Sequence, residues 1–183
     1  MNREEAFKLL SEYTKKPALI NHALAVEAAM REYARMFGED EEAWGIVGLL
    51  HDFDYERYPT REDHPFRGAE ILTKKGVPQE WINAILAHAD YSGVKRESMM
   101  SRTLFAVDEL VGFIVAVALV RPSKKLEDVE VKSVIKKMKD KAFAAAINRE
   151  DIKLGAEELG IPLEKHVEVV LEGMKKIAGK IGL

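Results

Sequence analysis

Residues 41–54, EEAWGIVGLLHDFD, decide the fold: an apolar run here ends in two polar side chains. The run from Ile46 to Leu50 has no charge, and Asp40, just upstream, suits the N-terminal cap of a helix. We therefore expect a buried helix that ends at His51 and Asp52. Packing alone favours neither side chain at that position, so the pair indicates a site where imidazole and carboxylate bind a divalent metal.

The rest of the chain shows the same helical spacing of apolar residues, and runs that alternate with period two are scarce. Proline opens and glycine closes several of the segments, as expected for helix ends. This pattern predicts an all-α protein with one domain over 1–183. Within it we expect a ligand-bearing core at about 17–120 and C-terminal helices at 121–183. The expected helices cover 4–13, 17–37, 40–52, 64–75, 78–88 and 98–119, followed by two or three within 126–183.

Composition excludes several classes of protein. A net charge of −3 gives no basic field for duplex nucleic acid. The most apolar stretch, 111–120, is half the length of about 20 residues that a bilayer span needs, so no membrane association is expected. The chain has no cysteine, which excludes disulfides and thiolate catalysis, and its polar start is unlike a signal peptide. We expect a cytoplasmic protein; its oligomeric state cannot be predicted.

Two further candidate ligands lie on apolar faces of predicted helices. His22 shares a face with Val26 and Ala29, although a hydrogen-bonded core histidine is the commoner explanation of such a residue. Asp108 is surrounded by apolar residues at helical spacing and needs a cation, because an unpaired buried carboxylate costs several kcal/mol. A metal ion is favoured over the alternative, a salt bridge to Arg102.

The remaining histidines differ in how much they indicate. His88 ends a helix on an inward face, with Asp90 nearby as a candidate acceptor for its second ring N–H. His64 begins a helix and by itself indicates little. His166 is flanked by charges, so we expect it on a solvated face and leave it out of the site.

Taken in order, an isolated His, a His-Asp pair, two more His and a distal Asp, with about one helix and one turn between members, resemble the HD-domain metal-dependent phosphohydrolase superfamily. The segment His64–Leu72, HPFRGAEIL, is similar to the His-containing helix of its dinuclear branch. The resemblance covers about 22–112. It implies an HD-type helical bundle and two divalent ions, of Mn, Fe, Mg, Ni or Zn.

The resemblance also implies roles for individual residues. Asp52 would bridge both ions as the catalytic carboxylate. One ion would be completed by His22, His51 and Asp108, and the other by His64 and His88. The Ile-Gly-Lys that follows the dyad in many relatives is replaced here by Phe53-Asp54-Tyr55, so the lysine that could donate a proton there is missing.

The expected function is hydrolysis of a phosphate ester or phosphoanhydride of a nucleotide or another small phosphorylated metabolite. Two alternatives stay open: a di-iron oxygenase of the inositol-oxygenase type, which has a similar ligand set, and a non-catalytic nucleotide-binding module. Cations and aromatic residues near the ligands in sequence, or on the C-terminal helices, are candidate substrate contacts: Arg67, Arg57, Arg61, Tyr55, Lys95, Lys141 and Arg149.

Overall fold

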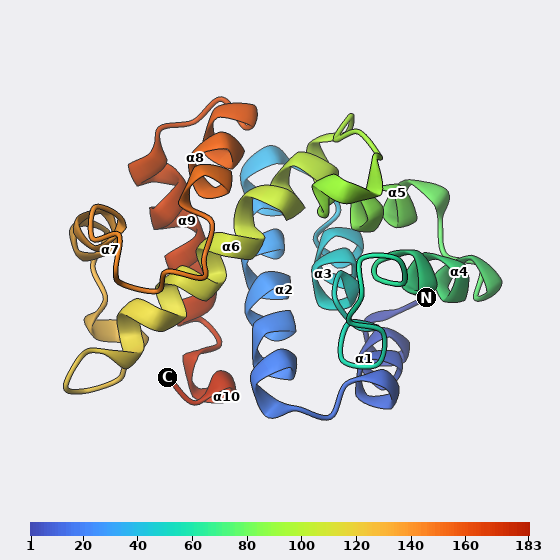
Figure 1. Cartoon of the computed structure of the whole chain (residues 1–183), viewed down its shortest axis with the longest axis horizontal. Coiled ribbons are helices and arrows are strands. Elements are labelled where there is room, and N and C mark those ends of the chain that lie inside the picture. Colours follow the sequence, from blue (N-terminus) through green and yellow to red (C-terminus); the bar gives the residue numbers. More distant parts are fainter.

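The computed structural model describes residues 1–183 as ten α-helices and two single turns of 3-10 helix, with no strand (Figure 1). The all-α prediction is therefore confirmed. The helices are α1 (Arg3–Tyr13), α2 (Pro17–Phe37), α3 (Glu41–Leu50), α4 (Phe66–Lys74), α5 (Gln79–Ala87), α6 (Met99–Leu119), α7 (Val131–Met138), α8 (Arg149–Glu158), α9 (Leu163–Lys175) and α10 (Ala178–Ile181).

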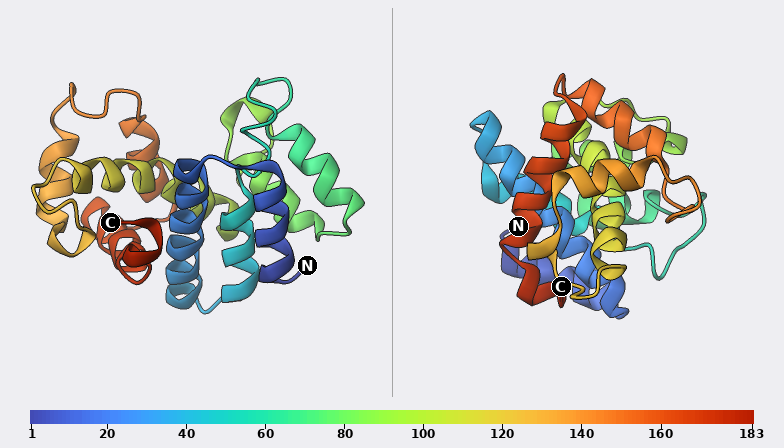
Figure 2. Two further views of the ribbon diagram at one scale, coloured as in Figure 1. Left: turned by 90° about the horizontal axis from the view of Figure 1, so that it is seen from below. Right: turned by 90° about the vertical axis from the view of Figure 1, so that its left-hand side faces the viewer.

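Two long helices organise the molecule. Helix α2 stands in the middle and packs against α3 on one side and α9 on the other. Helix α6 crosses α2 and runs from α5 to α7, so it belongs to both halves of the molecule (Figures 1 and 2). One hydrophobic core of 46 buried residues runs through all of these contacts. No helix is long and apolar enough to cross a membrane.

The helix ends follow the local chemistry of the sequence. The side chain of Asp40 accepts hydrogen bonds from two backbone N–H groups of α3, and Ser98 caps α6 in the same way. Gly38 closes α2 in the left-handed region at φ 72°.

The helix expected from about 64 starts at Phe66, a difference of two residues, because a proline disfavours helical backbone angles at the residue before it. The predicted number of C-terminal helices is wrong. The C-terminal part contains four α-helices rather than two or three. The extra one is α10, whose four residues are too few to show a helical periodicity in the sequence.

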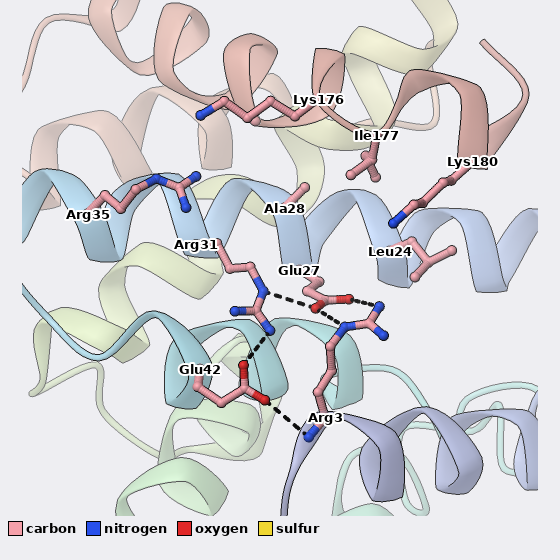
Figure 3. A pocket seen from close by; sticks show the side chains of 11 residues that line it. Arg3, Leu24, Glu27, Ala28, Arg31, Arg35, Glu42, Lys176, Ile177 and Lys180 are labelled. Atoms are coloured by element: carbon pink, nitrogen blue, oxygen red, sulfur yellow. Dashed lines mark hydrogen bonds and ion pairs between the residues drawn. The ribbon is translucent and has the colours of Figure 1, made fainter.

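An ion-pair network ties the N-terminus to the centre of the molecule, beside a hollow of about 510 Å³ (Figure 3). The Glu27 carboxylate is 6% exposed and accepts hydrogen bonds from Arg3 at 2.6 and 2.8 Å and from Arg31 at 3.0 Å. Arg31 also donates to Glu42 at 3.0 Å. These contacts join α1, α2 and α3, and no predicted metal ligand lines the hollow.

Candidate metal centre

Six side chains predicted as ligands gather into two adjacent groups. His22, His51 and Asp108 form one, and Asp52, His64 and His88 form the other. Within each group, one potential ligand atom per residue lies within 4.8 Å of the others. The residues come from α2, the end of α3, the segment before α4, the end of α5 and α6. A donor set of imidazole and carboxylate suits divalent transition metals.

Asp52 lies between the two groups. Its Oδ1 is 3.2 Å from His64 Nε2 and 3.3 Å from His88 Nε2, while its Oδ2 is 3.5 Å from His51 Nε2. Asp108 faces the first group, with Oδ1 at 2.9 Å from His22 Nε2. Each oxygen of Asp52 therefore faces a different group, which is the geometry that a bridging carboxylate needs.

Main-chain carbonyls at the ends of helices orient two of the histidines. The Nδ1–H of His51 donates to the carbonyl of Gly48 at 2.8 Å, and that of His88 donates to Ile85 at 2.5 Å. Each ring consequently presents Nε2 to the centre. The expected partner of His88, Asp90, is instead paired with Arg96, so that sequence prediction is wrong.

Asp54 orients the third histidine, and sequence reasoning missed it. Its carboxylate is 1% exposed, accepts from His64 Nδ1 at 2.8 Å, and accepts from the backbone N–H of Gly68 at 2.7 Å. A Cβ at Gly68 would lie 2.9 Å from the carboxylate carbon. A glycine inside the nine-residue α4 was the available signal, because an interior helical glycine often marks a close approach.

The carboxylates and imidazoles shift one another's pKa strongly. Burial acts to lower the pKa of His51, but the charges of Asp52 and Asp108 outweigh it and raise the pKa. At His64 burial is likewise outweighed, by hydrogen bonds to Asp52 and Asp54, and the pKa rises to about 9. Removal from water acts to raise the pKa of Asp52, yet His51, His64 and His88 hold it well below its usual range. Without metal the centre thus favours ionised carboxylates and protonated imidazoles, so a metal ion would bind in exchange for protons from the imidazoles.

One buried atom tests whether these residues fit a metal. His51 is fully buried, and its Nε2 has no hydrogen-bond partner although its Nδ1 is satisfied. Buried polar atoms are rarely left without a partner. This nitrogen points toward Asp52 and Asp108, at 3.5 and 3.4 Å, so a cation between these three residues would satisfy it.

Two candidate substrate residues, Tyr55 and Arg61, and the neighbouring Tyr91 lie beside the second group. The ring of Tyr55 meets His64 edge-on, with centroids 5.3 Å apart. The guanidinium of Arg61 lies 5.2 Å from the ring centroid of Tyr91. Burial, with a smaller contribution from the charge of Asp52, raises the pKa of Tyr91.

The other candidate substrate residues have partners elsewhere or face solvent. Arg57 donates to the Glu12 carbonyl, and Arg67 pairs with Asp63 and Glu70 on the surface.

In the C-terminal half, Arg149 donates to main-chain carbonyls between α7 and α8, among them Asp140 at 3.0 Å and Ile147 at 3.2 Å. Lys141 is exposed in the same connection, and Lys95 is exposed after η1 (Asp90–Ser92), beside Arg96 and Glu158. The structure does not bring Lys141, Arg149 or Lys95 together with the ligands.

His166 is buried, so its expected place on a solvated face is wrong. Its Nε2–H donates to the Ala106 carbonyl at 2.8 Å, and its Nδ1 lies 2.5 Å from the Tyr33 hydroxyl, which donates to it. The flanking charges were misleading, because Val170 and Met174 at i+4 and i+8 place His166 on the apolar face of α9.

The helices of this all-α domain bring histidines and aspartates into two groups that could each hold a divalent metal. The HD domain family model matches residues 19–167, most of the chain, and includes all six ligand candidates. The chain therefore belongs to the HD-domain family, a superfamily of metal-dependent phosphohydrolases whose members bind divalent metals. No curated protein and no solved structure matches the chain.

Proposed function

We propose that this protein hydrolyses a small phosphate ester or phosphoanhydride at a centre of two divalent ions. The observation that supports this proposal is the position of Asp52, with one oxygen toward each group of ligand atoms. His22, His51 and Asp108 would hold one ion, and His64 and His88 the other. Ions bound there would supply positive charge for the phosphate and lower the pKa of a water molecule.

The protein's own residues orient and expose this centre. Asp54 and two helix-end carbonyls hold the imidazoles in the tautomer that presents Nε2. The Asp52 and Asp108 side chains are 26% and 24% exposed, so a substrate can reach the ligands from solvent. In the proposed reaction the bond from phosphorus to the departing oxygen breaks, water supplies the hydroxyl that remains on phosphate, and the departing group takes up a proton. Tyr55, Arg61 and Tyr91, beside the second group, would border the phosphate.

Asp52→Asn tests the proposal. Replacing the shared carboxylate removes one negative charge from both groups, so bound metal should fall from about two ions per chain to less than one, and phosphate release should fall at least 100-fold. Elemental analysis and a screen of phosphorylated metabolites with manganese, magnesium, iron or nickel provide the two readouts, and circular dichroism checks that helical content survives. Full activity in the variant, or oxygen consumption by the iron-loaded protein without phosphate release, contradicts the proposal.

A further inference from the structure

A pocket of about 390 Å³ opens beside the first group of ligands. It lies between α2, the C-terminal half of α6 and the end of the chain at α10, which the Asn21 side chain ties to α2 through a hydrogen bond to the Ile181 carbonyl at 3.1 Å. Its walls include His22, Val115, Leu119, Ile181 and Leu183, and no Lys, Arg, Asp or Glu side chain lines it.

The pocket is lined by residues one helical turn away from the ligands His22 on α2 and Asp108 on α6. Ala18 lies one turn before His22 on α2, and Gly112 lies one turn after Asp108 on α6; both line the pocket. One turn of helix is about 5.4 Å, so the pocket begins within one turn of two ligand side chains. Gly112 can accept a side chain, because a Cβ there would meet only Ile147 Cδ1, at an ordinary contact distance of 3.6 Å.

The lining selects an apolar occupant. The amide of Asn21 is already engaged with Ile181, so the pocket offers few free hydrogen-bonding side chains to a sugar or a base. Leu119 is 49% exposed at the rim of the pocket. The volume lies within the range of small-molecule sites.

We infer that this pocket receives the apolar organic group of the substrate, so that the natural substrate is a phosphate ester of an aliphatic or aromatic alcohol. This inference rests on the proposed function, because the phosphate would lie at the ions while the alcohol portion lies along Gly112, Val115 and Leu119. Burial of each methylene is worth about 0.8 kcal/mol, which is about fourfold in affinity.

Two parallel series of ligands test the inference on the manganese-loaded protein. The first is the binding of n-alkyl phosphonates from methyl to octyl, measured by calorimetry; these have no ester bond to hydrolyse. The second is phosphate release from the matching n-alkyl phosphates. We expect affinity and kcat/KM to rise about fourfold per added methylene until the pocket is filled.

Variants test whether the alkyl chain binds in this pocket. Gly112→Leu should fill the pocket and flatten the dependence of affinity on chain length, and Leu119→Ser should weaken octyl phosphonate at least several-fold. Leu154→Ser is the matched control, because Leu154 is also an exposed leucine on a helix, 39% exposed on α8, but lies outside the pocket. It should match the wild type. If Gly112→Leu fails to fold, Leu119→Ser against Leu154→Ser decides.

The outcomes separate the inference from the proposed function. A chain-length dependence of phosphonate binding that both pocket variants reduce supports the pocket even if no ester is hydrolysed, a result that would overturn the proposed reaction alone. Hydrolysis of nucleotides or methyl phosphate with no chain-length dependence overturns the inference and leaves the reaction standing. If affinity depends on chain length equally in the wild type and in the pocket variants, the alkyl chain binds elsewhere, and the inference is overturned. The inference is also overturned if light scattering finds a dimer that Leu119→Ser dissociates and the ligand affinity does not depend on chain length.

Discussion

Asp54 shows how a single buried carboxylate prepares a ligand for its ion. It holds the ring of His64 from behind and is itself fixed by the N–H of Gly68, so three residues act as one unit. A carboxylate behind a ligating imidazole fixes its tautomer and raises its basicity, and loss of such a partner typically costs 10–100-fold in metal affinity.

Asp54→Asn should therefore weaken one ion and spare the other. The amide retains the shape but loses the charge and brings a donor toward the Gly68 N–H, so we expect affinity to fall about 10–100-fold at the group with His64. The group with His22 should keep its affinity. Calorimetric titration with manganese resolves the two sites, and Asp63→Asn, at a surface carboxylate paired with Arg67, is the control. An equal loss at both sites would mean that the variant only loosens the fold.

His166 predicts a pH dependence of stability that is independent of metal. Burial lowers its pKa to about 4, against an ordinary value of 6.5. The unfolded chain therefore binds the proton more readily, so the stability is complete above pH 6.5 and is lost as pH falls from 6.5 toward 4. The loss attributable to this residue is about 3 kcal/mol.

Urea unfolding of the chelator-treated protein from pH 7 to pH 4.5 measures this dependence. His166→Gln removes the titrating group, and the other histidines remain the same in both proteins. The free energy of unfolding of the variant should fall less steeply with decreasing pH. Parallel curves for the two proteins would show that His166 does not contribute.

Among single residues, the sequence predicts the metal ligands better than the residues that orient them. A histidine at the end of an apolar helix, such as His51, or an aspartate within one, such as Asp108, conflicts with its apolar surroundings and is visible in the sequence. Asp54 follows the dyad at the start of a charged loop, and nothing local distinguishes it from the half-buried Glu56 and the exposed Arg57 nearby. Its partner is ten residues away, and only the folded chain brings them together.

Among the elements, small residues allow the helices to approach closely. A Cβ on Gly155 of α8 would lie 2.5 Å from Ala106 Cα on α6, and one on Gly173 of α9 would lie 2.8 Å from the Ala28 carbonyl on α2. Both neighbours are backbone atoms or are attached directly to them, so neither can move aside without moving a helix. These two contacts set the spacing of α8 and α9 against the long central pair.

Gly155→Ala should destabilise the protein by about 1–3 kcal/mol even though alanine favours a helix, because the added methyl forces α8 away from α6. The control is Gly179→Ala on α10, where a Cβ would meet nothing within 4 Å, and we expect it to be neutral or stabilising by less than about 1 kcal/mol. Chemical denaturation compares the two. If both substitutions stabilise the protein, α8 can move away from α6 at little cost in free energy, which contradicts the prediction.

The order and type of the helices were predictable, because caps and glycines mark their ends and apolar residues mark their faces. Helices α1 to α6 begin and end within about two residues of the predicted positions. The region after α6 was less predictable. Its helices are short and their ends are marked by few caps, and how α8 and α9 pack depends on close contacts with residues more than 40 positions earlier in the chain.

Over the whole molecule, the six ligands lie in one half and the C-terminal helices contribute none. Helix α6 connects the halves, because it holds Asp108 in the centre and also packs against α7, α8 and α9. Local unfolding of either half therefore disturbs α6. We expect metal binding to stabilise the entire chain rather than a local segment.

Removal of metal should lower the melting temperature in a single transition. Ions at 100 times their dissociation constant stabilise a folded protein by about 2.7 kcal/mol per site, which corresponds to about 5–10 °C for a domain of this size. Calorimetry with EDTA and with added manganese measures the shift. Leu154→Ser should retain the shift and Asp52→Asn should lose most of it. Two separate transitions, of which only one responds to metal, would show that the halves unfold independently.

The spread of the ligands from position 22 to position 108 has a consequence for a chain that lacks cysteine. No covalent bridge can join its distant segments, so the ions would act as removable cross-links that fasten five segments at one point. How long this protein resists unfolding or proteolysis in a cell would then track the local supply of transition metal, and scarcity would shorten its lifetime as well as silence its chemistry.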